Sequence, residues 1–484
     1  MLKFTKINQT NPDKISSELR TKHFKEIYSR FARKKAEEQS SRCSQCGIPF
    51  CQIHCPLQNN IPDWLKLTAE DRLEEAYEIS SATNNMPEVC GRICPQDRLC
   101  EGNCVIEQSG HGSVTIGSIE KYITDVAWEK GWVKKINVIN EKQKSVGIIG
   151  SGPAGLAAAE QLRKKGYQIT IYDRYDRPGG LLIYGIPNFK LEKEIIKKRT
   201  DRLRESGINF VLNCQIGSTI TFDQLRKKHD VILIATGVYK SRKISLNHSK
   251  ANNVIQALDF LIASNKKGLN DNVIDFENGK LDTKDKKVVV IGGGDTAMDC
   301  VRTAIRQGAK SVECLYRRDK KNMPGSQREV KNAIEEGVIF NWLTLPIEYL
   351  GKDKITHTKI VKMQLGSPDE SGRRSTEAIP DSQEILEVDL IIEALGFEPE
   401  DLPKIFDKNE LTVTQWGTLK INHKNMMTNL EGVFAAGDIV RGASLVVWGI
   451  KDGRDAADSI HRYFENKEQN IANKKNNLME LANV

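Results

Sequence analysis

The 484-residue sequence has no long apolar runs. The longest ones, such as Val231–Ala235 and Leu445–Trp448, are far shorter than the roughly 18 residues that a membrane-spanning helix needs. The N-terminus, MLKFTKINQT, also lacks the apolar stretch of a secretory signal. We therefore expect a cytoplasmic protein that has no membrane partner.

A strong excess of charge of one sign is also missing. The 72 basic and 64 acidic residues give a net charge of +8, which is mild for this length. No basic block carries interleaved aromatic residues, so we expect no nucleic-acid partner. The simplest interpretation is a solvated surface, and the alternative is a basic patch for a phosphorylated ligand or an acidic partner.

Cysteine is scarce outside one segment. Eight of the 11 cysteines lie between Cys43 and Cys104, and residues 145–213 contain none. Because cytosolic thiols stay reduced, this dense group predicts metal binding rather than disulfides. The hydrophobic content of 39% is enough for packed cores, and the length suggests about three domains.

The cysteines form two groups of four. The first group has the spacing C-x2-C-x4-C-x3-C-P and the second C-x3-C-x5-C-x3-C. Thiolates in tight loops bind iron–sulfur clusters or zinc, and C-x2-C alone is common in zinc sites. The proline after Cys55 is typical of bacterial ferredoxins, and two groups of four match two [4Fe–4S] clusters. We predict iron–sulfur clusters, with zinc as the alternative.

The last cysteine of a ferredoxin-type run ligates the other cluster, which predicts a crossed pairing of the two groups. The first ligand set is then Cys43, Cys46, Cys51 and Cys104. The second set contains Cys55, Cys94 and Cys100. Its fourth ligand is either Cys90 or a group other than cysteine, in which case Cys90 is a buried free thiol.

A first dinucleotide-binding pattern follows the predicted strand 145–149. It is the sequence GSGPAG, with its glycines at Gly150, Gly152 and Gly155, and Asp173 follows the next strand. The glycines permit a tight turn, close approach of a pyrophosphate and helix–strand packing. An acidic residue that accepts a ribose hydroxyl suits a nucleotide without a 2′-phosphate, which means FAD or NAD.

The same strand–glycine–helix–strand unit returns over Lys287–Tyr316. Its turn and helix start contain Gly292, Gly294, Asp295 and Thr296. Arg317 and Arg318 follow its second strand, and guanidinium groups match the geometry of a 2′-phosphate. We therefore predict that this unit prefers NADPH to NADH, unless both arginines are ordinary surface charges.

The order of these patterns predicts the domain organisation. A strand that ends at Gly437 and Asp438 places a carboxylate and amides near the ribityl–pyrophosphate part of a flavin. Strands that alternate with helices predict an α/β protein with parallel sheets. We expect a helical iron–sulfur domain over 1–130, a linker over 131–144, FAD-binding segments over 145–284 and 396–465, an NADPH-binding domain over 285–395 and a loosely ordered tail over 466–484. Helices are expected over 24–31 and 61–80.

Longer blocks resemble one known family. The cysteine groups and the blocks PGGLLIYGIPNFKLEK, GGGDTAMDC, YRRDKKNMPGS and AAGDIVRGASLVVWGIKDGR are similar to small (beta) subunits of NADPH-dependent glutamate synthase. The resemblance implies two Rossmann-like FAD and NADPH domains of the disulfide-reductase-like flavoprotein type behind a helical domain with two [4Fe–4S] clusters. It adds Gly180 and Leu181 to the FAD site. Where the family usually has Glu, this chain has Asp173, which keeps the carboxylate.

The same module is similar to the electron-entry part of dihydropyrimidine dehydrogenase. In that wider family one cluster ligand is a Gln or Glu after the second cysteine group, and Glu120 falls at the matching place. The resemblance implies hydride transfer from NADPH to FAD, then single electrons through the clusters to a large (alpha) subunit that makes L-glutamate from glutamine and 2-oxoglutarate.

Hydride transfer needs stacking more than a protein acid or base, so we predict no catalytic residue. The lack of cysteine over 145–213, and of a C-x2-C pair between Cys300 and Cys314, argues against a dithiol relay. Residue 2 is Leu rather than the cysteine of N-terminal amidotransferases, so glutamate formation is expected on the partner. The alternatives are a stand-alone NADPH:ferredoxin or sulfide-linked oxidoreductase, and a zinc-stapled nucleotide-binding regulator.

Overall fold

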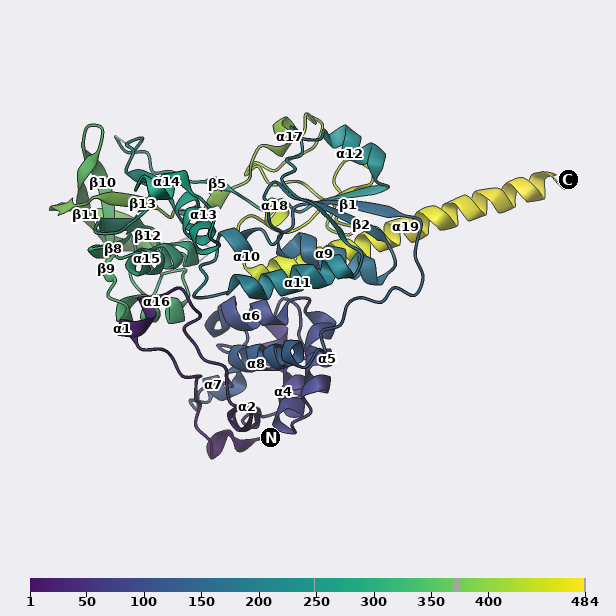
Figure 1. Cartoon of the computed structure of the whole chain (residues 1–484), viewed down its shortest axis with the longest axis horizontal. Helices are drawn as coiled ribbons and strands as arrows, with labels where there is room; N and C mark the ends of the chain where they lie inside the picture. The colour runs from purple at the N-terminus through teal and green to yellow at the C-terminus, as the bar shows by residue number, and fades with distance from the viewer. Residues whose placement is uncertain (248, 369–373, 483–484) are drawn as a thin grey trace.

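The structure is a computed structural model that describes residues 1–247, 249–368 and 374–482. An N-terminal helical domain lies below two α/β domains, and the C-terminal helix projects from the domain on the right of Figure 1. This arrangement confirms the predicted fold class, with two Rossmann-like domains behind a helical domain. No helix in the described ranges has both the length and the apolar character that crossing a membrane requires.

The N-terminal domain is built from short helices around one apolar core. Trp64, Ile119 and Ile123 are fully buried in this core. Gly91 lets α6 approach α8 closely, since a Cβ there would lie 2.7 Å from the amide nitrogen of Lys121. The helices are α1 (Ser17–Arg20), α2 (Arg33–Ser40), α3 (Phe50–Ile53), α4 (Ile61–Ala69), α5 (Leu73–Thr83), α6 (Pro87–Ile93), α7 (Val105–Gln108) and α8 (Ile116–Glu129), with 3-10 turns η1 (Lys3–Thr5) and η2 (Gln96–Arg98).

Two helix predictions in this domain need correction. The helix expected over 24–31 is wrong, because this segment is extended and the amide of Ile15 donates to the carbonyl of Ile27 at 3.0 Å. Of its apolar side chains, Ile27 and Phe31 are buried and Phe24 and Tyr28 are half-buried. The helix expected over 61–80 is two helices, because the chain turns at Asp71, whose φ is +62°.

The first α/β domain contains a parallel five-stranded sheet in the order β15-β4-β1-β2-β3. The central strands β1 and β4 and the neighbouring β15 are buried on both faces, which explains their continuous apolar runs. They are β1 (Ser145–Ile149), β2 (Gln168–Tyr172), β3 (Asn209–Val211), β4 (Val231–Ile234) and β15 (Val433–Ala435). The helices of this domain are α9 (Pro153–Lys164), α10 (Leu181–Tyr184), α11 (Lys193–Glu205), α12 (Phe222–Lys228), α17 (Leu402–Ile405), α18 (Asp438–Arg441) and α19 (Val446–Ala482).

The second α/β domain contains a parallel sheet in the order β6-β13-β7-β8-β9 and an antiparallel sheet β10-β11-β12. The first sheet comprises β6 (Val254–Gln256), β7 (Lys287–Ile291), β8 (Ser311–Tyr316), β9 (Ile339–Trp342) and β13 (Leu390–Glu393). The second comprises β10 (Thr344–Gly351), β11 (Ile355–Pro368) and β12 (Arg374–Glu387). The helices are α13 (Ala257–Gly268), α14 (Ile274–Glu277), α15 (Asp295–Arg306) and α16 (Gln327–Glu335).

The boundary between the two α/β domains differs from the expected position at 284/285. Strand β6 pairs with β13, so β6 and α13 already belong to the second domain. A three-residue strand without a glycine turn carries little sequence signal, which is why the boundary was placed too late. The chain passes between the domains along β5 (Lys240–Ser241) and β14 (Phe397–Glu398), which pair antiparallel.

The tail also differs from the expectation of loose order over 466–484. Helix α19 continues through Ala482 and projects beyond the body of the molecule (Figure 1). Its first half is anchored by the buried side chains of Ala456, Ile460 and Phe464. Adding residues to an existing helix is far easier than nucleating one, so the polar continuation is helical.

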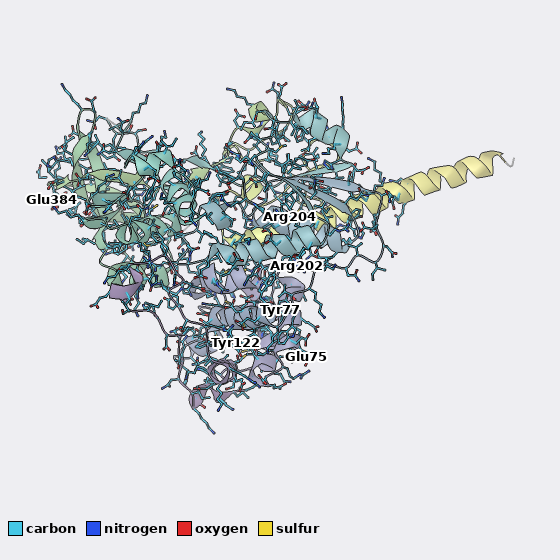
Figure 2. All side chains as sticks on the ribbon, in the orientation of Figure 1. Glu75, Tyr77, Tyr122, Arg202, Arg204 and Glu384 are labelled. Atoms are coloured by element: carbon cyan, nitrogen blue, oxygen red, sulfur yellow. The ribbon has the colours of Figure 1, made fainter. Side chains whose placement is uncertain are left out.

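The helical domain and the first α/β domain meet along α11. Arg199 forms two hydrogen bonds of 2.7 Å to the carboxylate of Glu88 on α6, and both side chains are buried. One turn further along α11, Arg202 lies near Tyr77 of α5 (Figure 2). Separating a buried ion pair leaves its charges uncompensated, so this pair opposes movement of the helical domain relative to the first α/β domain.

Candidate redox centres

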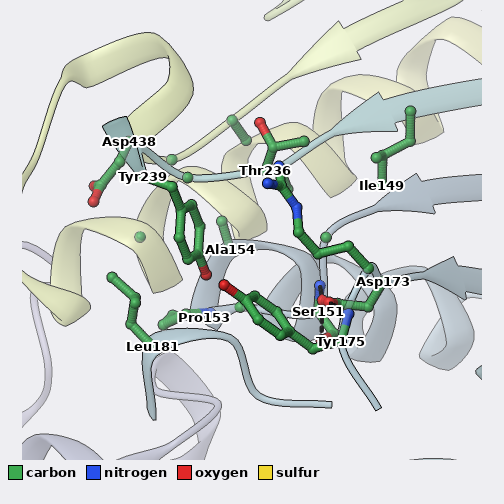
Figure 3. Close-up of a pocket in the computed structure, with 18 of the residues that line it drawn as sticks. Ile149, Ser151, Pro153, Ala154, Asp173, Tyr175, Leu181, Thr236, Tyr239 and Asp438 are labelled. Carbon is green, nitrogen blue, oxygen red and sulfur yellow. Dashed lines mark hydrogen bonds between the residues drawn. The ribbon is translucent and has the colours of Figure 1, made fainter. Parts of the chain in front are cut away.

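A long cleft crosses the carboxyl edge of the first sheet (Figure 3). The structure brings together at this cleft most of the residues that the sequence predicted for FAD. The lining includes Gly150, Gly152, Asp173, Leu181, Gly437 and Asp438. Gly155 and Gly180 lie behind the lining and permit close packing, since Cβ atoms there would lie 2.0 Å from the carbonyl oxygen of Gly150 and 2.9 Å from the Cα of Gly152.

The first glycine turn fits a diphosphate. Gly150 has a φ of +106°, and a Cβ there would lie 2.3 Å from the carbonyl oxygen of Ala235. A Cβ at Gly152 would meet nothing within 4 Å, so this side of the turn is open. Helix α9 begins at the next residue, and its N-terminus offers unpaired amides and a positive dipole end to an anion.

Asp173 is buried at the edge of this turn. Its carboxylate accepts hydrogen bonds from the amide and hydroxyl of Ser151, the former at 2.8 Å, and from the amide of Tyr175 at 2.9 Å. The carboxylate is therefore fixed against the turn while it lines the cleft. Each carboxylate oxygen accepts more than one hydrogen bond, so a ribose hydroxyl is compatible with this arrangement.

Asp438 lines the opposite side of the cleft (Figure 3). The hydroxyl of Ser444 donates to its Oδ1 at 2.6 Å. Burial raises the pKa of this carboxyl to about 6. Gly437, with a φ of +79°, turns the chain from β15 into α18 and so aims the carboxylate at the cleft.

The cleft is also lined by two tyrosines and an arginine, and no sequence motif indicated these three residues. The hydroxyl ends of Tyr175 and Tyr239 point toward each other in Figure 3, and their ring centroids are 6.1 Å apart. The guanidinium of Arg174 lies 5.4 Å from the Tyr239 ring centroid and binds both carboxylate oxygens of Glu400. The only available signal was the position of Arg174 and Tyr175 directly after the acidic residue.

The second glycine turn lies at the carboxyl edge of the second sheet. Gly292 has a φ of +144°, and a Cβ at Gly294 would meet nothing within 4 Å. Asp295 and Thr296 begin α15, as the pattern predicted. The Asp295 carboxylate accepts a hydrogen bond of 2.9 Å from the amide of Ser326, which brings the loop before α16 onto the turn.

The two arginines after β8 have different environments. Arg317 is exposed, whereas Arg318 is buried and its Nε donates to the carbonyl of Arg374 at 2.9 Å. Both follow β8, the strand whose equivalent in the first domain leads to Asp173. The ends of the two strands therefore carry opposite charges.

The cysteines surround two separate cavities. The outer cavity is lined by Cys43, Cys46, Cys51 and Cys104. The inner cavity is lined by Cys55, Cys90, Cys94, Cys100 and Glu120. The structure thus brings the residues together in the two sets that crossed pairing predicted. No three His, Cys, Asp or Glu side chains in the described ranges converge tightly enough to hold a single metal ion.

The donor sets fit iron–sulfur clusters, which thiolates hold. At the inner cavity, both candidates for the fourth ligand are present. The carboxylate of Glu120 accepts hydrogen bonds of 3.2 Å from Asn59 and Asn84, and burial raises its pKa to about 8. The thiol of Cys90 lies 3.8 Å from the side-chain oxygen of Asn84.

The cleft and the two cavities lie in series. Val446 of α19 lines the cleft, and its neighbour Val447 lines the inner cavity. Ile116, at the start of α8, lines both the inner and the outer cavity. The successive sites therefore have adjacent or shared lining residues.

Beyond the outer cavity the surface is apolar. Ile48, Phe50 and Ile53 are 64%, 41% and 56% exposed, and Val105 is 37% exposed. The segment over 43–60 contains no Asp, Glu, Lys or Arg. A segment without these charged residues that exposes several large apolar side chains is typical of a protein contact rather than of a solvated face.

Two family matches divide the chain at the boundary between the helical and α/β parts. Residues 20–132 match the family described as dihydropyrimidine dehydrogenase domain II, 4Fe-4S cluster. Residues 144–453 match the pyridine nucleotide-disulphide oxidoreductase family. The structure of Mycobacterium tuberculosis FprA in complex with NADPH covers 68% of this chain and 86% of its own, with a TM-score of 0.59 and 20% identity. At this identity the likeness shows the fold alone.

Curated relatives match over nearly the full length. The chain is 60% identical to the glutamate synthase (NADPH) small chain of Azospirillum brasilense, over 97% of each protein. It is 44% identical to the glutamate synthase (NADPH) small chain of Escherichia coli, over 96% of this chain and 98% of that one. The putative oxidoreductase AegA of Escherichia coli is 42% identical over 93% of this chain and 69% of its own.

Proposed function

The chain belongs to the glutamate synthase small-chain family, and from this premise we propose that it is the electron-input subunit of a glutamate synthase. It is an NADPH oxidoreductase whose cofactors are FAD, NADPH and 4Fe–4S clusters. In the proposed reaction, NADPH reduces FAD by hydride transfer, and two clusters pass single electrons to a large subunit in the cytoplasm. That subunit forms L-glutamate from glutamine and 2-oxoglutarate.

One observation carries this proposal, namely the series of cleft, inner cavity and outer cavity. A flavin accepts two electrons at once and releases them singly, and clusters carry one electron each. A flavin in the cleft is next to the inner cavity through Val446 and Val447. The outer cavity in turn lies beneath the apolar surface. The order of sites therefore supports export of electrons to another protein.

We assign the sites as follows. FAD takes the cleft, with its diphosphate at the first glycine turn and Asp438 at the ribityl end. NADPH takes the second glycine turn, with its 2′-phosphate on Arg317 and Arg318. The outer cluster takes Cys43, Cys46, Cys51 and Cys104, and the inner cluster takes Cys55, Cys94, Cys100 and Glu120.

Glu120 is our choice for the fourth ligand of the inner cluster. Two asparagines hold its carboxylate at the cavity, whereas the Cys90 thiol interacts with the Cys94 thiol and lies 3.8 Å from the side-chain oxygen of Asn84. We expect Cys94→Ser and Glu120→Ala each to lower iron and acid-labile sulfide by about one cluster. Cys90→Ser is the matched control and should keep the full iron content. Loss of iron in Cys90→Ser with retention in Glu120→Ala would reverse this assignment.

The Cys94→Ser variant should still allow NADPH to bleach the flavin absorbance anaerobically, because both nucleotide sites lie outside the helical domain. Co-purification of the native protein tests the partner. A larger FMN-containing chain supports the glutamate synthase, and a protein that reduces ferredoxin alone supports the stand-alone oxidoreductase. A colourless, zinc-containing protein would overturn the whole proposal.

A further inference from the structure

The loop between two inner-cavity cysteines reaches across to the NADPH domain. This loop runs from Cys94 to Cys100 and contains η2. Figure 1 shows α16 of the second α/β domain next to the helical domain. The chain just after the loop packs closely against it, since a Cβ at Gly102 would lie 1.9 Å from the carbonyl oxygen of Asp97.

Asp97 and Arg98 of this loop bind the residues that precede and begin α16. The Asp97 carboxylate accepts hydrogen bonds from the hydroxyl of Ser326 at 3.4 Å and from the amide of Gln327 at 3.3 Å. Arg98 donates to the carbonyl of Pro324. The Ser326 side chain makes no capping bond to α16, so a carboxylate from another domain occupies the helix N-terminus.

The residues that precede α16 also form hydrogen bonds with the second glycine turn. The amide of Gly325 donates to the carbonyl of Gly293 at 2.9 Å, and the amide of Ser326 donates to Asp295 at 2.9 Å. A Cβ at Gly325 would lie 3.1 Å from the Gly293 oxygen, so the contact is close. Residues 324–326 are thus bonded to the cysteine loop on one side and to the nucleotide turn on the other.

We propose that Asp97 and Arg98 are positioning residues for NADPH, which hold the loop 323–327 against the nucleotide turn from the helical domain. This inference rests on the proposed function, because it takes the second glycine turn as the NADPH site. A coupling between two sites is reciprocal. Nucleotide binding therefore tightens the loop that carries Cys94 and Cys100.

The direct test measures NADP⁺ binding to the oxidised holoenzyme by calorimetry. We expect Asp97→Ala with Arg98→Ala to raise the Kd for NADP⁺ about three- to tenfold, the effect of losing one helix cap and its neighbour. KM for NADPH should rise by the same factor with kcat unchanged. Asp97→Asn should restore most of the affinity because Asn also caps helices well. Glu78→Ala, an exposed acidic residue of α5, is the matched control.

A variant on the other side of the contact guards against a folding defect. Gln327→Pro removes the backbone N–H that donates a hydrogen bond to the Asp97 carboxylate. Proline is well tolerated at the first position of a helix. This variant should raise the Kd as Asp97→Ala does. Iron and flavin contents are measured for each variant, and only those with full contents are compared.

Hydrogen exchange tests the reciprocal effect. NADP⁺ should slow exchange of the amides over 96–101 in the wild type and leave their exchange unchanged in the double variant. An unchanged Kd in both the double variant and Gln327→Pro overturns this inference alone. A wild type that does not bind NADP⁺ overturns the proposed function together with it.

Discussion

At the scale of residues, the charge after the second strand differs between the two dinucleotide units, and we propose that this difference selects the nucleotide. Asp173 follows β2, whereas Arg317 and Arg318 follow β8. Arg318 also donates to the carbonyl of Arg374, so it has a structural contact besides its proposed role. Arg317 is exposed at the same strand end.

We expect Arg317→Ala with Arg318→Ala to raise KM for NADPH about tenfold to a hundredfold, as expected for lost hydrogen bonds to a charged group. KM for NADH, which lacks the 2′-phosphate, should change less than about twofold on the same reasoning. The single variant Arg317→Ala is the control that keeps the Arg374 contact. Equal losses for both nucleotides would contradict the 2′-phosphate role.

His229 links stability to pH at another residue. It is buried, its Nε2 and the hydroxyl of Tyr172 are hydrogen-bonded at 2.9 Å, and burial lowers its pKa to about 4. Below pH 6.5 the unfolded chain therefore takes up a proton on this histidine that the folded chain refuses until about pH 4. Its contribution to stability is complete above pH 6.5 and is lost as the pH falls toward 4.

We expect this loss to amount to about 2 kcal/mol between pH 6.5 and 4. The measurement compares Tm of the wild type and of the non-titrating variant His229→Gln across that range. The Tm advantage of the wild type should shrink as the pH falls. A difference that stays constant with pH would show that His229 does not titrate differently on unfolding.

At the scale of elements, the sequence predicted whatever depends on short-range geometry. The glycine turns, the parallel strands around them and the crossed cysteine sets follow from chain stereochemistry and spacing. The non-helical structure of segment 24–31 did not follow from the sequence, because Ile27 and Phe31 are buried through tertiary packing rather than on one helical face. Strand β6 was missed because only its pairing with β13 makes it a strand. Tyr239 reaches the cleft through tertiary folding, which no local pattern indicates.

The contact between α9 and α19 allows a test at this scale. A Cβ at Gly453 of α19 would lie 2.2 Å from the carbonyl oxygen of Ala154 on α9, a backbone atom that cannot move aside. We expect Gly453→Ala to destabilise the first α/β domain by at least about 2 kcal/mol and to lower flavin content. Thermal unfolding and absorbance measure both effects.

The control is Gly268→Ala at the end of α13, where a Cβ would meet nothing within 4 Å. Alanine is a better helix former than glycine, so this variant should be unchanged or stabilised by up to about 1 kcal/mol. Equal Tm values for the two variants would show that the helices α9 and α19 separate at little cost.

At the scale of the whole molecule, the three domains place their sites on one route. The NADPH turn and the flavin cleft occupy different α/β domains, and the cysteine cavities continue from the cleft toward the apolar surface. In the proposed reaction, electrons enter as hydride at one end and leave through the helical domain. We propose that a second protein binds where they leave.

The surface over the outer cavity is therefore where we expect the large subunit to bind. Ile48 and Ile53 are 64% and 56% exposed within a segment that lacks charged residues. Burying a carboxylate at such a contact without a partner is costly, and apolar contacts at the centre of an interface carry about 2 kcal/mol or more each. We expect Ile48→Asp with Ile53→Asp to weaken binding of the large subunit at least about tenfold.

Iron content, flavin content and reduction of the flavin by NADPH should be unchanged in that variant. Neither isoleucine is a proposed cluster ligand, and neither lies at a nucleotide site. Ile274→Asp is the matched control, because Ile274 is 75% exposed on α14, which lies in the second α/β domain rather than in the helical domain. Binding is measured by analytical ultracentrifugation of the reconstituted subunits. Loss of binding in Ile274→Asp, with retention in Ile48→Asp and Ile53→Asp, would move the docking surface to the NADPH domain and break the proposed route at its last step.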